Sequence, residues 1–217
     1  DQSSVGTNWG VGDIMYADLD GDGKICNGTN KLGDTGDYRI IGNSTPRFKY
    51  GITLDAAWKG FDFSIFMQGI GKRDLWLDGC YFWGANGQGN EWQSTGFAEQ
   101  WDFFRPEGDQ LGANLNSYYP RVNFSGDRNT KVQTRYLQNG AYLRLKNVQL
   151  GYTLPRVWTE KAGISSVRVY VSGDNLATIT SLSKIFDPEA TGSLAGTGSG
   201  KLYPLQRVIS VGVNVNF

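Results

Sequence analysis

The last ten residues of the chain, 208–217, alternate between apolar and polar side chains. Successive side chains of an extended strand point to opposite faces, so this segment has one apolar and one polar face. The apolar face carries Ile209, Val211, Val213, Val215 and Phe217. The length matches the roughly 9–11 residues of a tilted β-strand that crosses a bilayer. Two structures fit this pattern, a membrane-spanning strand that ends a β-barrel and the last strand of a soluble β-sandwich.

Two earlier regions show the same alternation. Residues 47–70 contain two alternating stretches around Lys59-Gly60, which predicts a β-hairpin with a tight turn. Residues 141–175 predict two more strands, joined by a short connection with a helical turn at 158–162. Together with the final strand, which we place at 206–217, the chain has five predicted strands.

The strand predicted within residues 141–154 contains an irregularity. Leu143 and Leu145 point to one face, whereas Val148 and Leu150 point to the other, so the apolar phase slips between the two pairs. A β-bulge explains such a slip, because it adds one residue to one strand of a pair. The other explanation is that the upper part of the strand stands above a membrane.

The segments between the strands alternate in length. Residues 1–46, 71–140 and 176–205 are long, whereas the connections inside the two strand pairs are short. If the final strand ends in the periplasm, all three long segments emerge on the outer side, as in transmembrane barrels. Five strands cannot close a barrel, since the smallest have about 8. The fold class we predict is therefore all-β, the C-terminal five antiparallel strands of a larger barrel with long extracellular loops.

An acidic motif lies in the first long segment. Asp18, Asp20 and Asp22 stand at positions one, three and five of the motif. Gly23 at the sixth position permits a sharp turn, and Lys24 at the seventh offers its main-chain carbonyl, as at the start of an EF-hand-type loop. We predict a bound divalent cation in a structural role, Ca²⁺ before Mg²⁺. The alternative is an Asp/Gly turn without an ion.

The second half of this motif departs from the usual loop. Its ninth and twelfth positions hold Cys26 and Thr29, and neither supplies a carboxylate. The simplest way to supply the missing ligands is an insertion over residues 26–33, which would bulge out and return the chain to the ion. Asp34 and Asp37 then become further candidate ligands, with Asp37 closing the site.

Composition excludes several classes of function. The 217 residues include 21 basic and 21 acidic side chains, so the surplus of positive charge that nucleic-acid binding needs is missing. The chain has no His, which removes the usual general base and zinc ligand, and we predict no enzymatic activity. An enzyme could use a carboxylate pair such as Asp187 and Glu189 as acid and base, but this pair is a weak signal. The chain has only two cysteines, Cys26 and Cys80, which are too few to form a metal knuckle. They could form one disulfide or remain as two free thiols.

The segment 71–140 is unusually long and rich in aromatic residues. Such residues could stack on sugar rings or bind a partner, and our candidates for contact with a substrate or a lid are Trp76, Trp83 and Trp92. The alternative is a local core that keeps the long loop folded. Residues 96–104 could form a short helix within it.

Several stretches together resemble the SusC/RagA family of TonB-dependent outer-membrane transporters of Bacteroidetes. They are residues 12–14, 18–25, 37–46, 60–62, 142–155, 172–176, 186–189 and 203–204, and the likeness extends over nearly the whole chain because these stretches are spread along it. The departures are the insertion after Ile25 and the divergent segment 71–140.

This resemblance implies a multi-pass barrel of about 22 strands in the bacterial outer membrane, with a plugged lumen. It further implies import of peptides or of oligosaccharides, the latter as glycan uptake. The energy would be relayed by TonB, and a SusD-like lipoprotein would form a lid on the outer loops. The chain would then be a C-terminal fragment that lies against lipid and against the rest of the barrel and plug. The rival hypothesis is a secreted, calcium-stabilised, carbohydrate-binding β-sandwich.

Overall fold

A computed structural model describes residues 1–29, 31–87, 96–192 and 200–217. Among these residues no helix has the length and apolar character needed to cross a membrane. The chain divides into two compact units. The first comprises residues 1–42, 76–137 and 191–202, and the second comprises residues 43–75, 138–190 and 203–217.

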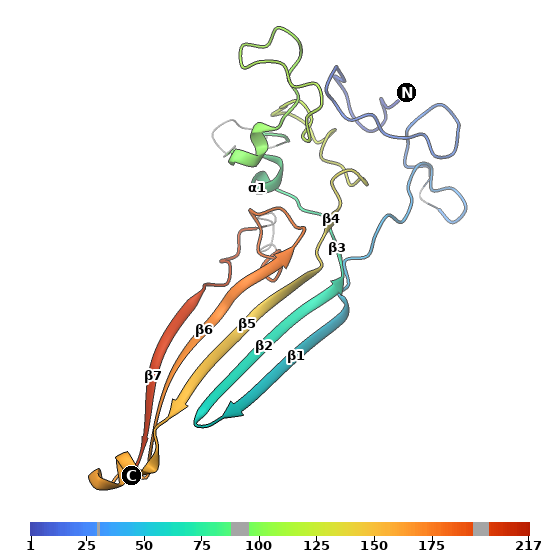
Figure 1. Cartoon of the computed structure of the whole chain (residues 1–217). Coiled ribbons are helices and arrows are strands. Elements are labelled where there is room, and N and C mark those ends of the chain that lie inside the picture. Colours follow the sequence, from blue (N-terminus) through green and yellow to red (C-terminus); the bar gives the residue numbers. More distant parts are fainter. Residues whose placement is uncertain (30, 88–95, 193–199) are drawn as a thin grey trace. The chain divides into compact units, whose positions relative to one another are not determined.

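The second unit is built on a five-stranded antiparallel sheet whose strands lie side by side in chain order (Figure 1). The strands are β1 (Arg47–Trp58), β2 (Phe61–Lys72), β5 (Tyr142–Thr153), β6 (Ser166–Thr180) and β7 (Val208–Asn216). Lys59 and Gly60 form the tight turn between β1 and β2, and both have positive φ. The five predicted strands and the hairpin are confirmed.

Shorter elements complete the fold. The strands β3 (Asp74–Leu75) and β4 (Gln138–Asn139) pair with each other, and the helices are α1 (Cys80–Trp83), η2 (Ala98–Trp101), α2 (Arg156–Thr159) and η3 (Glu160–Ala162). The 3₁₀ helix η2 confirms the short helix predicted in the long segment. The helices α2 and η3 confirm the helical turn between the third and fourth long strands.

A β-bulge at Lys146 accounts for the phase slip. Met67 of β2 pairs with Leu145 and Phe66 pairs with Asn147, so Lys146 is the extra residue of β5. Because of this extra residue, Leu143 and Leu145 return to the face that carries Val148 and Leu150. The apolar face of the sheet is therefore unbroken, and of the two explanations the bulge is the one found.

The two faces of the sheet differ in chemistry. One carries apolar side chains that remain exposed, including Leu54 at 55%, Ile209 at 70% and Val211 at 76%. The other carries polar groups, and there Arg168 of β6 is hydrogen-bonded to Asp62 of β2. This pair lies over Gly151, where an added Cβ would come within 2.5 Å of both side chains. A side chain at that position of β5 would therefore displace the Arg168–Asp62 pair from its place.

The first unit has a small aromatic core inside the long segment. Phe82 and Trp83 of α1 pack with Tyr119 and Tyr136, and all four side chains are at most 5% exposed. The Trp83 and Tyr136 rings meet edge to face, with centroids 4.8 Å apart. These aromatic residues therefore form a local core, which was the alternative to contact with a substrate or a partner.

Candidate functional site

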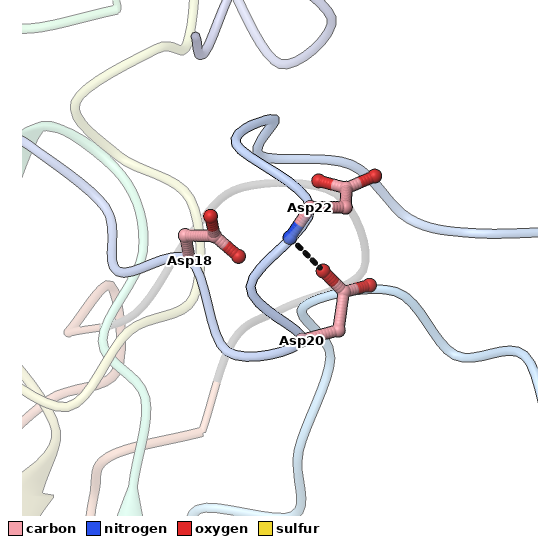
Figure 2. A group of neighbouring side chains, drawn as sticks. All are labelled: Asp18, Asp20 and Asp22. Carbon is pink, nitrogen blue, oxygen red and sulfur yellow. Dashed lines mark hydrogen bonds between the residues drawn. The ribbon is translucent and has the colours of Figure 1, made fainter.

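The acidic motif forms a turn that gathers three carboxylates. Asp18, Asp20 and Asp22 each offer an oxygen, and these oxygens lie within 4.8 Å of one another on the surface (Figure 2). Gly21 and Gly23 both have a φ of 82°, the left-handed conformation that glycine adopts without strain. Three like charges this close repel each other, so a divalent cation between them would stabilise the turn.

Backbone amides hold this turn in shape. The N–H groups of Gly21 and Gly23 donate to the Asp18 carboxylate at 2.6 and 2.8 Å. The N–H of Lys24 donates to Asp22 at 2.7 Å. The carboxylates are therefore positioned by the chain that carries them, as the alternation of Asp and Gly predicts.

Asp37 closes the base of the loop through hydrogen bonds to the backbone. Its carboxylate accepts the N–H of Leu19 at 2.6 Å and that of Cys26 at 2.8 Å, and these bonds hold its pKa below the usual value. Asp34 instead accepts hydrogen bonds from Thr29. The insertion thus returns the chain to the motif, but neither Asp34 nor Asp37 is part of the group of three carboxylates.

A cavity of about 500 Å³ borders this loop within the first unit. Its lining includes Leu19, Ile25 and Asp37 of the loop, together with residues 130–134. An ion that ordered the loop would therefore also order this part of the lining.

The carboxylate of Asp13 is enclosed within the first unit, with its side chain 3% exposed. It forms ion pairs with Arg121 at 2.7 Å and Arg128 at 3.2 Å, and Asn129 donates to it at 2.8 Å. These three side-chain partners lie 108 or more residues away along the chain. No local pattern marks such a residue, and we did not predict this role from the sequence.

Acid should weaken this arrangement. Burial of Asp13 opposes ionisation, but hydrogen bonds from Arg121, Asn129 and the Gly10 N–H outweigh it, so the pKa lies below its usual 3.8. A lowered pKa in the folded state means that ionised Asp13 stabilises the unit above the unfolded pKa of about 3.9. This contribution is lost as the pH falls through the lower, folded pKa.

We therefore expect hydrogen-exchange protection of the Ile14 amide, corrected for intrinsic rate, to fall between pH 6 and pH 3. That amide donates to Asn129, one of the partners of Asp13. In Asp13→Asn the pH dependence should be much smaller. An equal pH dependence in the two proteins would show that another group is responsible.

The tryptophans selected from the sequence have different surroundings. Trp83 is 3% exposed within the aromatic core, so it has almost no surface to offer a substrate or a lid, and that prediction is corrected for this residue. Trp76 is half-buried and lies beside Trp83, with ring centroids 5.8 Å apart. Trp92 lies outside the described residues. Cys26 and Cys80 are both free thiols.

A cluster of four charges lies in the second unit. Arg144 of β5 pairs with Asp187 at 2.6 Å and contacts Glu189 at 3.2 Å, and Lys146 pairs with Glu189 at 3.0 Å. Burial of Asp187 raises its pKa, but hydrogen bonds from Arg144 and from backbone N–H groups outweigh this effect and lower it. An acid held ionised in this way is a poor proton donor, which disfavours an acid–base role.

Comparison with known proteins identifies the class. Two TonB-dependent receptors of Formosa agariphila, P3 and P26, are 32% and 29% identical to the chain, over 95% of its length in each case. No protein-family model matches the sequence. The chain spans about a fifth of the length of these relatives, 19% and 20%. The relatives are named as receptors and not as enzymes.

Solved structures agree with this result. The structure of the RagAB peptide transporter matches with a TM-score of 0.62 and 27% identity, over 85% of this chain and 18% of that one. The RagAB peptide importer in the open-open state matches equally well, over 19% of its chain. The fold and the relatives identify the chain as a fragment of a TonB-dependent receptor. Within that class, the fragment is similar to the corresponding part of a SusC/RagA-like transporter.

Proposed function

We propose that the chain is part of a multi-pass outer-membrane importer, driven through TonB, that takes up oligosaccharides or peptides with a SusD-like lipoprotein as partner. The relatives named as TonB-dependent receptors support the TonB part of this proposal. The RagAB structures are named as peptide transporters, which supports peptides as one substrate class. The rest of the barrel and its plug would come from the part of such a protein that this chain does not span.

The observation that carries the proposal is the exposed, unbroken apolar face of the five-stranded sheet. A soluble sandwich covers this face with a second sheet, because exposed apolar patches of this size cause association in water. In the described part of the chain the Val and Ile side chains of β7 stay 42–76% exposed. The bulge in β5 keeps this face continuous, which is what a surface in contact with lipid requires.

A charge on the proposed lipid face should therefore make insertion less favourable. In the full-length transporter, Val211→Arg in the middle of β7 should destabilise the inserted barrel by about 2–4 kcal/mol, because arginine is costly near the bilayer midplane. Ser210→Arg, one residue earlier and on the polar face, should have a small effect. The effect of each variant is measured as the amount of folded, heat-modifiable protein in outer membranes. Equal losses in the two variants would contradict lipid contact at Val211.

Import itself is tested with the full-length protein in its own outer membrane. We expect uptake of a labelled peptide or oligosaccharide that stops when a protonophore removes the proton gradient, and a surface lipoprotein that co-purifies with the transporter. Uptake that continues without the gradient would contradict energy transfer through TonB. Comparison of a peptide mixture with an oligosaccharide mixture then separates the two substrate classes.

We also propose that the group of Asp18, Asp20 and Asp22 binds Ca²⁺, with oxygen ligands completed by the Lys24 carbonyl and water. The role is structural, since the ion would neutralise three crowded carboxylates and stiffen the loop. Mg²⁺ is a weaker fit, because it demands stricter octahedral geometry than an exposed loop provides. Asp34 and Asp37 would stabilise the loop through their hydrogen bonds without binding the ion.

Asp20→Ala tests this proposal. We expect calorimetric Ca²⁺ affinity of the full-length protein to fall at least tenfold and protease cleavage within residues 18–42 to become faster, because one of three charged ligands is lost. The matched control is Glu107→Ala, which removes an exposed carboxylate elsewhere in the same unit. Unchanged Ca²⁺ uptake in the Asp20 variant would remove the assignment.

A further inference from the structure

The charge cluster of the second unit contains two carboxylates that are held very differently. Asp187 accepts hydrogen bonds from Arg144 Nη2 at 2.6 Å, from the Glu189 N–H at 2.9 Å and from the Leu205 N–H at 3.0 Å. Asp187 therefore ties the segment around it both to β5 and to the residues that lead into β7. It is a fixed structural anchor.

Glu189 has far fewer bonds. Lys146 Nζ donates to its Oε2 at 3.0 Å, but its Oε1 makes no hydrogen bond although Arg144 Nη1 lies 3.2 Å away. Arg144 Nη1 also makes no hydrogen bond and is buried. The pair is thus a charge contact without the hydrogen bonds that make buried ion pairs favourable. Glu189 is the weakly held member of the cluster.

Arg144 and Lys146 form a preorganised pair of cations. Arg144 Nε donates to Thr178 Oγ1 at 2.8 Å, which fixes the guanidinium, and the Arg144 side chain is 5% exposed. Lys146 is the bulge residue of β5, and its side chain is 22% exposed. A carboxylate from solvent can therefore reach this pair on the side of Lys146, and the buried guanidinium of Arg144 can hold it from the other side.

We propose that Arg144 and Lys146 form a carboxylate-binding site on β5, that Glu189 occupies it in this structure, and that the carboxylate of a ligand can replace Glu189. The site takes a carboxylate from a peptide-like molecule or from an acidic sugar. Asp187 stays bound during this exchange and keeps the segment attached to the sheet. Glu189 thus acts as an internal competitor that lowers the affinity of the site for weak carboxylates.

The first test measures binding of ¹³C-labelled acetate to the purified full-length protein by NMR. Glu189→Ala removes the competitor and leaves a space of suitable size, so acetate affinity should rise about tenfold or more over the unmodified protein. Lys146→Met added to this variant should abolish the gain. Glu189→Gln keeps the size of the side chain and should give a smaller gain, so it replaces the alanine variant if that protein does not fold.

A matched control is Glu160→Ala, which removes the exposed partner of Arg156 in a surface ion pair and should leave acetate binding unchanged. No gain in both Glu189 variants, or a gain that survives Lys146→Met, would overturn the proposal. N-acetylglycine and glucuronate, measured in the same variants, distinguish a peptide source of the carboxylate from a sugar source. Failure of both to bind to the alanine variant would also count against the site.

The second test uses a protease site that the chain already has. Lys184 is exposed in the segment that Glu189 helps to hold. Replacing chloride with acetate at constant ionic strength should accelerate tryptic cleavage after Lys184 in the unmodified protein, because the contact of Glu189 with Lys146 is lost while Asp187 still holds the segment. In Glu189→Ala this contact is already missing, so acetate should not accelerate the cleavage further. An equal response in both proteins would contradict exchange at Glu189. Neither test involves uptake, so failure here would leave the import proposal standing.

Discussion

Asp13→Ala is expected to destabilise the first unit by about 3 kcal/mol, at the lower end of what losing one partner of a buried ion pair costs. The substitution leaves Arg128, whose side chain is 7% exposed, without its carboxylate, and it removes the carboxylate that accepts hydrogen bonds from Arg121 and Asn129. Segments that lie more than 100 residues apart in the sequence would lose a common anchor. Hydrogen exchange of residues 10–16 and 121–129 in the full-length protein measures the effect.

Asp127→Ala is the matched control. Asp127 belongs to the same unit and forms an ion pair with Lys131 at 3.0 Å, but its side chain is 76% exposed. Exposed pairs contribute about 0–1 kcal/mol, so protection should hardly change. Similar losses of protection in the two variants would mean that burial of Asp13 has no special role.

Phe82→Ala should have an effect of comparable size on the aromatic core of the long segment. Phe82 is 1% exposed and packs edge to face on Trp83 and Tyr119, with ring centroids 5.2 and 5.7 Å away. Truncation of a buried Phe costs about 3–5 kcal/mol, because the transfer energy is lost and a cavity is left behind. We expect much faster hydrogen exchange over residues 117–137.

The control for this variant is Phe124→Ala in the same segment. Phe124 is 40% exposed, so its truncation leaves little or no cavity and should cost far less. If both variants exchange equally fast, the segment has no specific core at Phe82. A segment of this length needs such a core, since it cannot otherwise hold a defined surface.

The sequence by itself determined the elements whose signal is local. The alternation in β1, β2 and β7 identified these strands, because adjacent side chains of a strand always face opposite sides. The acidic turn was likewise readable, since Asp and Gly at fixed spacing favour one backbone path. The slip in β5 was visible as well, although two explanations for it remained open.

Only the tertiary structure decided what depends on contacts between distant residues. It selected the bulge at Lys146, because that choice is made by the register with β2 and β6. It placed Trp83 in a core and drew Asp187 and Glu189 onto β5 as ion-pair partners. The physical reason is that periodicity reports the direction of a side chain relative to its own strand, whereas its partners are set by packing across the fold.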